Sequence, residues 1–195
     1  MLPNPFPPHR QKKTMSGLLH RNRVVRSLPL AFLLSAGCGG GDNGIAPLNP
    51  TIGGTRQFGH LEFNATTTKR SFAKGEIVPV TLKIKNTGTT LVSGTYADCN
   101  DSDARITDNS GTKWLYSGTI GGCGGVVRPF SVLPGGMIAL IVNWDQKAQD
   151  GSLVSAGTYS IKTWMNSGTI SEGSSNEAQR EANLFAPPIE VTLTR

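Results

Sequence analysis

Apolar and polar residues alternate along most of the chain from about residue 56 onward. In the stretch IVPVTLKIKN, residues 77–86, every second residue from Val78 to Ile84 is apolar. A period of two predicts a strand with one face in the core and the other in solvent. Apolar residues in phase also predict strands in MIALIVNW, GTYSIKTWM and IEVTLTR. Their in-phase residues are Ile138, Leu140 and Val142; Tyr159, Ile161 and Thr163; and Ile189, Val191 and Leu193.

Shorter strands are expected at HLEFNAT, ARITD, KWLYS and VVRPFSVL, separated by turns rich in Gly, Asn, Asp and Pro. Almost no segment has a helical period. About 7–9 short strands at this spacing predict an all-β fold, an Ig-like antiparallel β-sandwich. Residues 56–195 are enough for one such domain with a substantial core.

One segment departs from the alternation. Residues 166–188 are polar, and SSNEAQREANLF within them favours a short helix. A loop this long inside a compact domain is usually functional or disordered. A mobile insertion without a partner is the alternative interpretation.

The N-terminal part of the chain has the organisation of an export signal. Arg21, Arg23 and Arg26 precede an apolar run of nine residues, 28–36, which is far shorter than the roughly 20 residues of a membrane-spanning helix. We therefore expect residues 1–37 to be a signal peptide, and we place the hypothetical translation start at Met15.

The small residues directly before Cys38 resemble the lipobox of bacterial lipoproteins. The resemblance implies that Cys38 becomes the first mature residue, carries lipid and holds the protein on a membrane of the cell envelope. Gly39 rather than Asp follows, which favours the outer membrane where the cell has one. Residues 38–55 are then a lipidated cysteine with a flexible linker. The alternative is an ordinary secretory signal followed by a Gly-rich linker.

The chain has three cysteines. With Cys38 lipidated, Cys99 and Cys123 remain as a pair in an exported protein, so we expect a disulfide between them. By closing the loop between them, the disulfide would stabilise the fold by about 3.5 kcal/mol in the chain-entropy model. The alternative, a metal-binding thiol pair, has no histidine near either cysteine and makes a poor zinc site.

The net charge of +6 suggests a nucleic-acid partner until it is divided along the chain. Six basic residues and no acidic residue lie in 1–37, whereas the thirteen basic and thirteen acidic residues after them cancel. The mature protein therefore has no excess of positive charge to attract phosphates, and no nucleic-acid partner is expected.

Catalytic residue patterns are scarce. His60 is the only histidine outside the signal peptide, which leaves little material for a Ser-His or Cys-His nucleophile. We expect no cofactor, although the sequence leaves a hydrolase with paired carboxylates open. Two oxygen-rich clusters suit either calcium or tight turns. They are Asp98, Asp101 and Asp103, and Asn143, Asp145 and Asp150; we predict no metal site.

The order of three segments between Glu62 and Trp164 resembles the intracellular proteinase inhibitor BsuPI family. The pattern is a Gly-Glu pair opening a strand that ends in Asn, an Asp-x-x-Gly turn before a Trp, and a closing Pro-Gly, Trp-Asp, Gly and Gly-Thr-Tyr series. The matching residues are Gly75, Glu76, Asn86, Asp108, Gly111, Trp114, Pro134, Gly135, Trp144, Asp145, Gly151, Gly157, Thr158 and Tyr159. They have a structural explanation too, since Trp fills a core while Gly and Asp shape turns.

The resemblance implies a non-enzymatic binding module with a protein partner, in one version a protease inhibited through an exposed loop. The two candidate loops are Asp98–Gly125, braced by the expected disulfide, and Asn166–Pro188. The cysteine-containing segment and the long second loop are not part of the family pattern. The alternative is a structural or assembly-related Ig-like envelope lipoprotein. An enzyme is the third hypothesis.

Overall fold

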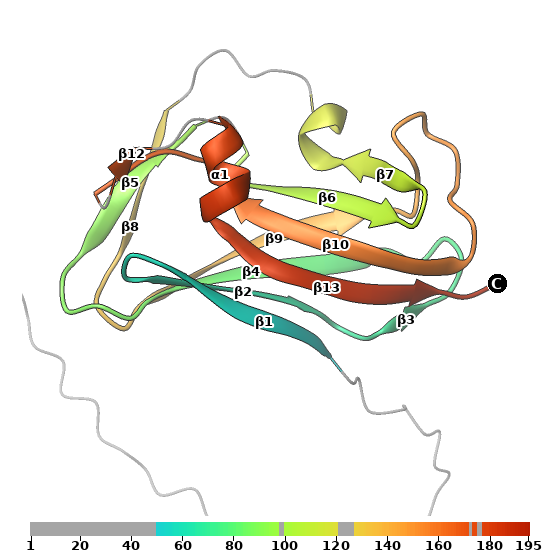
Figure 1. The fold of residues 1–195 in the computed structure, drawn as a ribbon, viewed down its shortest axis with the longest axis horizontal. Helices are drawn as coiled ribbons and strands as arrows, with labels where there is room; N and C mark the ends of the chain where they lie inside the picture. Colours follow the sequence, from blue (N-terminus) through green and yellow to red (C-terminus); the bar gives the residue numbers. More distant parts are fainter. Residues whose placement is uncertain (1–49, 98–99, 121–126, 172, 175–176) are drawn as a thin grey trace, which may run out of the picture. The chain divides into compact units, whose positions relative to one another are not determined.

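The computed structural model describes residues 50–97, 100–120, 127–171, 173–174 and 177–195, which fold into three β-sheets (Figure 1). Cys38, Cys99 and Cys123 lie outside the described residues, so lipidation and the disulfide stay predictions. The described residues all fall within one unit, residues 44–195.

Sheet A is antiparallel and has the order β1-β2-β4-β9. Its strands are β1 (Thr51–Phe58), β2 (Leu61–Thr67), β4 (Val78–Asn86) and β9 (Met137–Trp144). The predicted alternation in β4 is confirmed: Val78 and Ile84 are fully buried, whereas Lys83 and Lys85 are exposed. The side chains of β4 therefore fix which face of sheet A lies on the core.

Sheet B lies over the buried face of sheet A and has the order β3-β13-β10-β6-β7. Its strands are β3 (Ser71–Phe72), β13 (Phe185–Leu193), β10 (Gly157–Met165), β6 (Ser102–Asp108) and β7 (Gly111–Leu115). Only β3 and β13 pair in parallel among the described strands. Buried side chains of the two sheets form one hydrophobic cluster, which confirms the all-β sandwich.

Sheet C continues strands of both layers at one end of the sandwich (Figure 1). Its strands are β12 (Gly173–Ser174), β11 (Ser167–Ile170), β5 (Val92–Tyr96) and β8 (Arg128–Val132). β5 follows β4, β8 precedes β9, and β11 follows β10 after the single residue Asn166. The β4–β9 pair thus bends at Asn86 and continues as the β5–β8 pair.

The predicted linker 38–55 extends too far. Strand β1 begins at Thr51, five residues before the expected domain start at Arg56. A Cβ atom on Gly53 would lie 2.8 Å from the Cγ2 atom of Ile189, so glycine allows β1 to approach β13 closely. The Gly53–Gly54 pair looks like a linker in the sequence but serves backbone packing in the fold.

The segment 166–188 is not the expected loop. It contains β11, β12 and the helix α1 (Glu177–Asn183), and it ends inside β13. The short helix predicted there is confirmed. In β11 the buried Ser167 donates a hydrogen bond to the carbonyl oxygen of Thr95 (3.0 Å). Because small polar residues pack in this strand, it carries no hydrophobic alternation for a sequence pattern to detect.

Candidate functional site

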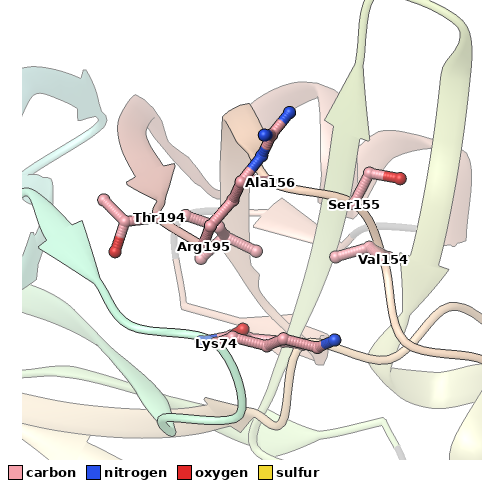
Figure 2. Close-up of a pocket in the computed structure, with 8 residues that line it drawn as sticks. Lys74, Val154, Ser155, Ala156, Thr194 and Arg195 are labelled. Atoms are coloured by element: carbon pink, nitrogen blue, oxygen red, sulfur yellow. The ribbon is translucent and has the colours of Figure 1, made fainter.

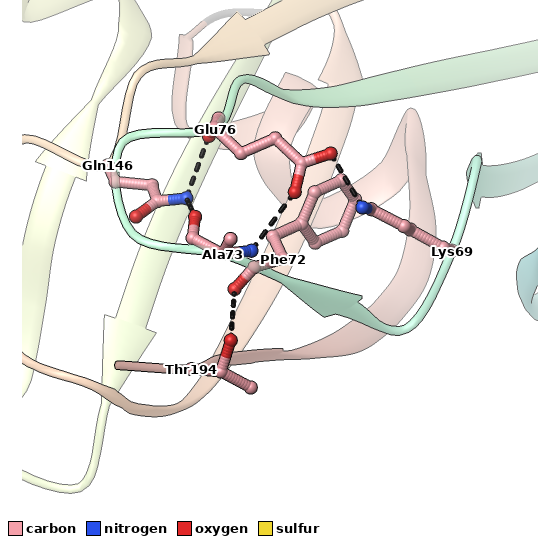
Figure 3. Close-up of polar contacts among 6 residues, drawn as sticks. All are labelled: Lys69, Phe72, Ala73, Glu76, Gln146 and Thr194. Atoms are coloured by element: carbon pink, nitrogen blue, oxygen red, sulfur yellow. Dashed lines mark hydrogen bonds and ion pairs between the residues drawn. The ribbon is translucent and has the colours of Figure 1, made fainter.

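The side chain of Gln146 is the centre of a polar cluster that holds the β3–β4 turn (Figure 3). It is 2% exposed, donates through Nε2 to the carbonyl oxygens of Ala73 (2.6 Å) and Glu76 (2.7 Å), and accepts from the amide of Gly75 (2.9 Å). The Glu76 carboxylate accepts from the amide of Ala73 and pairs with Lys69, which lowers the pKa of Glu76. Every polar atom of the Gln146 amide group therefore supports this turn.

Trp144 and Tyr159 pack next to this cluster. Trp144 is fully buried, its ring lies edge-on to that of Tyr159 at 5.3 Å, and its indole nitrogen donates to the carbonyl oxygen of Lys147 (2.8 Å). The Tyr159 hydroxyl donates to the carbonyl oxygen of Ser155, four residues upstream (2.7 Å). Such a tyrosine-to-backbone bond at a sandwich corner is a feature of immunoglobulin domains.

A hollow of about 540 Å³ adjoins the cluster (Figure 2). Its lining consists of Lys74, Gln146, Val154, Ser155, Ala156, Leu193, Thr194 and Arg195. These residues include two cations but no acidic side chain, histidine or cysteine, and the Gln146 amide is already engaged. The lining therefore offers no acid, base and nucleophile in combination.

Asn86 holds the opposite end of β4. Its side chain is fully buried, and Nδ2 donates to the carbonyl oxygens of Thr90 (2.7 Å) and Val132 (2.9 Å). Its Oδ1 accepts from the amide of Gly88 (2.9 Å), and its backbone carbonyl accepts from the amide of Gly135 (2.9 Å). Asn86 thereby joins the β4–β5 bend to the β8–β9 turn.

The remaining motif residues also shape turns or fill the core. Asp108 accepts from the amide of Ser110 (2.8 Å), and Asp145 accepts from the amide of Lys147 (3.2 Å). Positive φ angles occur at Gly75, Gly111, Gly135 and Gly151, and Pro134 directly precedes Gly135 in the β8–β9 turn. Trp114 is buried, and β10 begins with Gly157 and Thr158. The motif residues are thus spread over several turns and do not converge on one surface.

The two oxygen-rich clusters are engaged within the fold. Asp101 pairs with Arg128, and the buried Asp103 accepts from the amides of Ala104 (2.8 Å) and Ser117 (3.0 Å). Asp150 accepts from Ser152, while Asp98 lies outside the described residues. Within the part of the chain that the structure describes, no three His, Cys, Asp or Glu residues gather as a metal site.

The described part of the candidate inhibitory loop Asp98–Gly125 is residues 100–120. It contains β6 and β7 of sheet B and a 3-10 turn (Tyr116–Thr119). The second candidate, Asn166–Pro188, is occupied by β11, β12, α1 and the start of β13. In both segments, described residues pair with neighbouring strands, whereas residues 121–125 at the end of the first candidate lie outside the described residues.

Strand β9 is an edge of sheet A without the usual protection against strand pairing. It has eight residues with no charge and no proline, and it pairs with β4 over eight consecutive positions without a bulge. Each other sheet edge among the described residues is short, bulged or carries a charged residue or proline. These edges are β1 with Arg56 and a bulge, β3 and β12 with two residues, β7 with Lys113 and a shifted register, and β8 with Arg128 and Pro129. Proteins normally guard edges in these ways.

Hydrogen bonding at the β8–β9 turn tells which β9 backbone groups point outward. The amide of Asn86 donates to the carbonyl oxygen of Gly136 (3.0 Å), so this pair is hydrogen-bonded and the alternation continues down the ladder. Residues 138, 140, 142 and 144 then bond to β4, whereas residues 137, 139, 141 and 143 direct their N–H and C=O groups away. Pro79, opposite Asn143, agrees with this phase because it has no N–H to donate. We call these outward groups the β9 edge.

Apolar side chains are exposed along this edge and at the bend beside it. Met137 and Ile141 on β9 are 57% and 62% exposed. Leu133 in the turn before β9 is 68% exposed, and Leu91 is 49% exposed. Because Val92 pairs with Val132, Leu91 and Leu133 are the next residues along the two strands. We call Leu91, Leu133 and Met137 the apolar bend.

Two hollows, of about 360 and 370 Å³, follow β9 and share Tyr116 in their walls. The first is lined by Ala139, Leu140 and Ile141, and the second by Asn143 and Asp145. Successive strand residues point to opposite faces, so a hollow lined by three in a row lies at the edge of the sheet. The opposite wall of the first includes the Asp101–Arg128 ion pair.

The same ion pair acts on Tyr96, whose pKa is raised to about 12 by burial and by the charge of Asp101, against the effect of Arg128. The folded protein keeps this proton above the ordinary pKa of 10.0, so its stabilising contribution is full below pH 10 and is lost as the pH rises toward 12. We expect Tyr96→Phe to lose less stability than wild type across this range in urea unfolding. Equal losses in both proteins would contradict the assignment.

Sequence reasoning identified Asn86, Trp144 and Tyr159 but missed Gln146 and the β9 edge. Gln146 lies in NWDQK, which resembles an ordinary polar turn. The signal for the edge was the absence of charge in MIALIVNW, since the outward positions of β4 carry Lys83 and Lys85. A dense apolar strand was consistent with full burial, and only the strand order places it at an edge.

No family model matches the chain, and no curated protein matches it significantly. The resemblance to the BsuPI family therefore stays a prediction. Within the described residues, no helix combines the length and apolar composition that a membrane crossing requires.

Several solved structures match part of this chain at low similarity. A β-glucosidase from Listeria innocua, solved with laminaribiose, is 12% identical with a TM-score of 0.39, over 70% of this chain and 16% of its own. The Pseudomonas fluorescens alkylpurine DNA glycosylase AlkC is 10% identical with a TM-score of 0.38, over 75% and 30%. A Pyrococcus furiosus CARDB domain, solved with di-metal ions, is 13% identical with a TM-score of 0.32, over 75% and 88%. This chain spans about a sixth of the glucosidase, and similarities at this level assign no activity.

Proposed function

We propose that the chain is a non-enzymatic, protein-binding β-sandwich module, held on the cell envelope by lipid on Cys38. The observation that carries the proposal is the concentration of exposed apolar side chains at the apolar bend and along the β9 edge. Single exposed apolar residues are ordinary, but several neighbouring apolar residues on a solvent-exposed face favour a protein contact. The proposal places this contact on a strand edge and its turn, because the described residues of the two segments predicted as inhibitory loops lie mostly in strands, a 3-10 turn and a helix.

The lipid on Cys38 supplies location rather than specificity. Only twelve residues separate Cys38 from Thr51, the first residue of β1, so the domain would be presented close to a membrane surface. One acyl group alone binds membranes weakly, whereas a multiply acylated cysteine anchors firmly. The partner is therefore expected among proteins of the same envelope compartment.

Site-specific photo-crosslinking in intact cells tests this function. Benzoylphenylalanine at Leu133 is expected to form one dominant adduct with another envelope protein. The matched control is benzoylphenylalanine at Lys74, an exposed residue on the β3–β4 turn. In a Cys38→Ser background the protein should leave the membrane fraction and the Leu133 adduct should decline.

Two outcomes would contradict the proposal. Equal adduct patterns at the Leu133 and Lys74 positions would show that the apolar bend has no selective partner and would favour the structural lipoprotein. Unchanged membrane attachment of the Cys38→Ser variant would contradict the proposal of a lipid anchor at Cys38. The crosslinks would still test the binding surface independently.

A further inference from the structure

The β9 edge presents the hydrogen-bonding pattern of a strand that lacks its neighbour. Met137, Ala139 and Ile141 direct N–H and C=O groups outward at every second residue, a repeat of about 6.8 Å in an antiparallel sheet. Only an extended polypeptide offers complementary groups at this repeat. The edge is uninterrupted over its eight residues, so nothing in β9 itself would break an added ladder.

The core beside this edge is also incompletely covered. Ile138 and Leu140 face the interior of the sandwich but are only half-buried, whereas their partners on β4, Ile84 and Leu82, are buried. The hollow lined by Leu140 and Tyr116 lies at the same place. An added strand would place alternate side chains in this hollow and against the exposed Ile141 on the other face.

The charge of the outward face indicates what the added strand carries. Lys83 lies opposite Ala139 and Lys85 opposite Met137, and both lysines are exposed. No ion pair among the described residues involves either lysine. An added strand would lie about 10 Å from β4, and the small side chain of Ala139 leaves room for Lys83 to reach across. An acidic residue opposite Ala139 would complete this pair.

The same charges disfavour a second copy of the chain as the occupant. Two copies joined through β9 would bring Lys83 and Lys85 of both onto one sheet face, and β9 contributes no acidic residue to offset them. Like charges held near one another destabilise an interface.

We infer that the β9 edge binds an extended segment of a partner protein as an added strand, with an acidic residue opposite Ala139 and apolar residues two positions to either side. This inference rests on the proposed function and names the partner's recognised segment. The flanking apolar residues would contact Met137 and Ile141, which lie two positions from Ala139 on the same face.

A phage-displayed library of random decapeptides, selected on the purified full chain in its soluble Cys38→Ser form, provides the probe. We expect enrichment of peptides in which Asp or Glu is flanked two residues away on both sides by apolar residues. The enriched peptide, synthesised with a fluorophore, is then titrated against variants by fluorescence anisotropy.

Ile141→Lys places a charge on the β9 edge and is expected to weaken binding of this peptide at least about tenfold. Thr66→Lys is the matched control, because Thr66 lies in the same cross-strand row of the same face, two strands away, and should change affinity less than about twofold. Lys83→Glu should weaken binding of the acidic peptide up to about fivefold. It should leave unchanged the binding of a peptide in which glutamine replaces the acidic residue. Circular dichroism and thermal midpoints verify that each variant is folded.

Several results would overturn the inference. These are no enrichment, enriched peptides that bind the Ile141→Lys variant equally well, or indifference of the acidic peptide to Lys83→Glu. A dimer in sedimentation that Ile141→Lys dissociates would assign the edge to a second copy. Leu133 crosslinks that persist when peptide selection fails would leave the proposed function standing without strand addition.

Discussion

Replacing Asn86 with Asp is expected to destabilise the fold by about 3 kcal/mol at pH 7. The amide nitrogen of Asn86 donates to two carbonyl oxygens, those of Thr90 and Val132, and the side chain is fully buried. An Asp carboxylate has the same shape but would face both carbonyls with negative charge and no proton to donate. Urea unfolding followed by tryptophan fluorescence measures the difference in the free energy of unfolding.

Asn109→Asp is the matched control, because it makes the same chemical change at an exposed turn residue. It should alter the free energy of unfolding by less than about 0.5 kcal/mol. Hydrogen exchange should also show the earliest loss of protection in β5 and β8, whose bends Asn86 joins to sheet A. Equal effects of the two substitutions would mean that the Asn86 amide donors contribute little.

Strands with one solvent-exposed face and one buried face were predictable from the sequence, and β4 shows why. Lys83 and Lys85 alternate with buried apolar residues because one face of the strand lies in solvent and the other on the core. β1 and β11 gave no such pattern, since Gly53 is required for close backbone approach and Ser167 is buried through hydrogen bonds. Backbone proximity and polar packing are decided by distant partners that local sequence does not encode.

Sheet order was the main feature that local patterning left open. The sequence predicts β9 as a strand, but its position at an edge follows from the long-range pairing of Met137–Trp144 with β4 and with no further strand among the described residues. The candidate binding surface consists of that edge. Its individual residues were visible in the sequence, whereas their exposure was not.

Gln146 is the other case in which a side chain's role depends on a distant segment. Its amide group bonds to Ala73, Gly75 and Glu76, about 70 residues earlier in the chain, and its backbone has a positive φ of 62°. A non-glycine residue in this conformation is uncommon and is held by its surroundings. The hydrogen bonds to the β3–β4 turn provide that restraint.

Gln146→Glu is therefore expected to destabilise the protein by about 3 kcal/mol at pH 7. A glutamate side chain can still accept the hydrogen bond from the amide of Gly75. In place of the Nε2 amino group, however, it has a carboxylate oxygen, which cannot donate and lies close to the carbonyl oxygens of Ala73 and Glu76. Below the pH at which this carboxyl takes up a proton it regains one donor, so the deficit should shrink as the pH falls. Urea unfolding at pH 7 and at pH 4 measures both effects.

Gln149→Glu is the matched control on the same loop. Its Oε1 accepts from the amide of Leu115 (2.9 Å), and this is the only hydrogen bond of its amide group among the described residues, so a carboxylate preserves it. The substitution should change the free energy of unfolding by less than about 0.5 kcal/mol. Similar losses at Gln146 and Gln149, or a Gln146→Glu deficit that does not shrink at low pH, would show that the two donors of Gln146 are not what holds the β3–β4 turn.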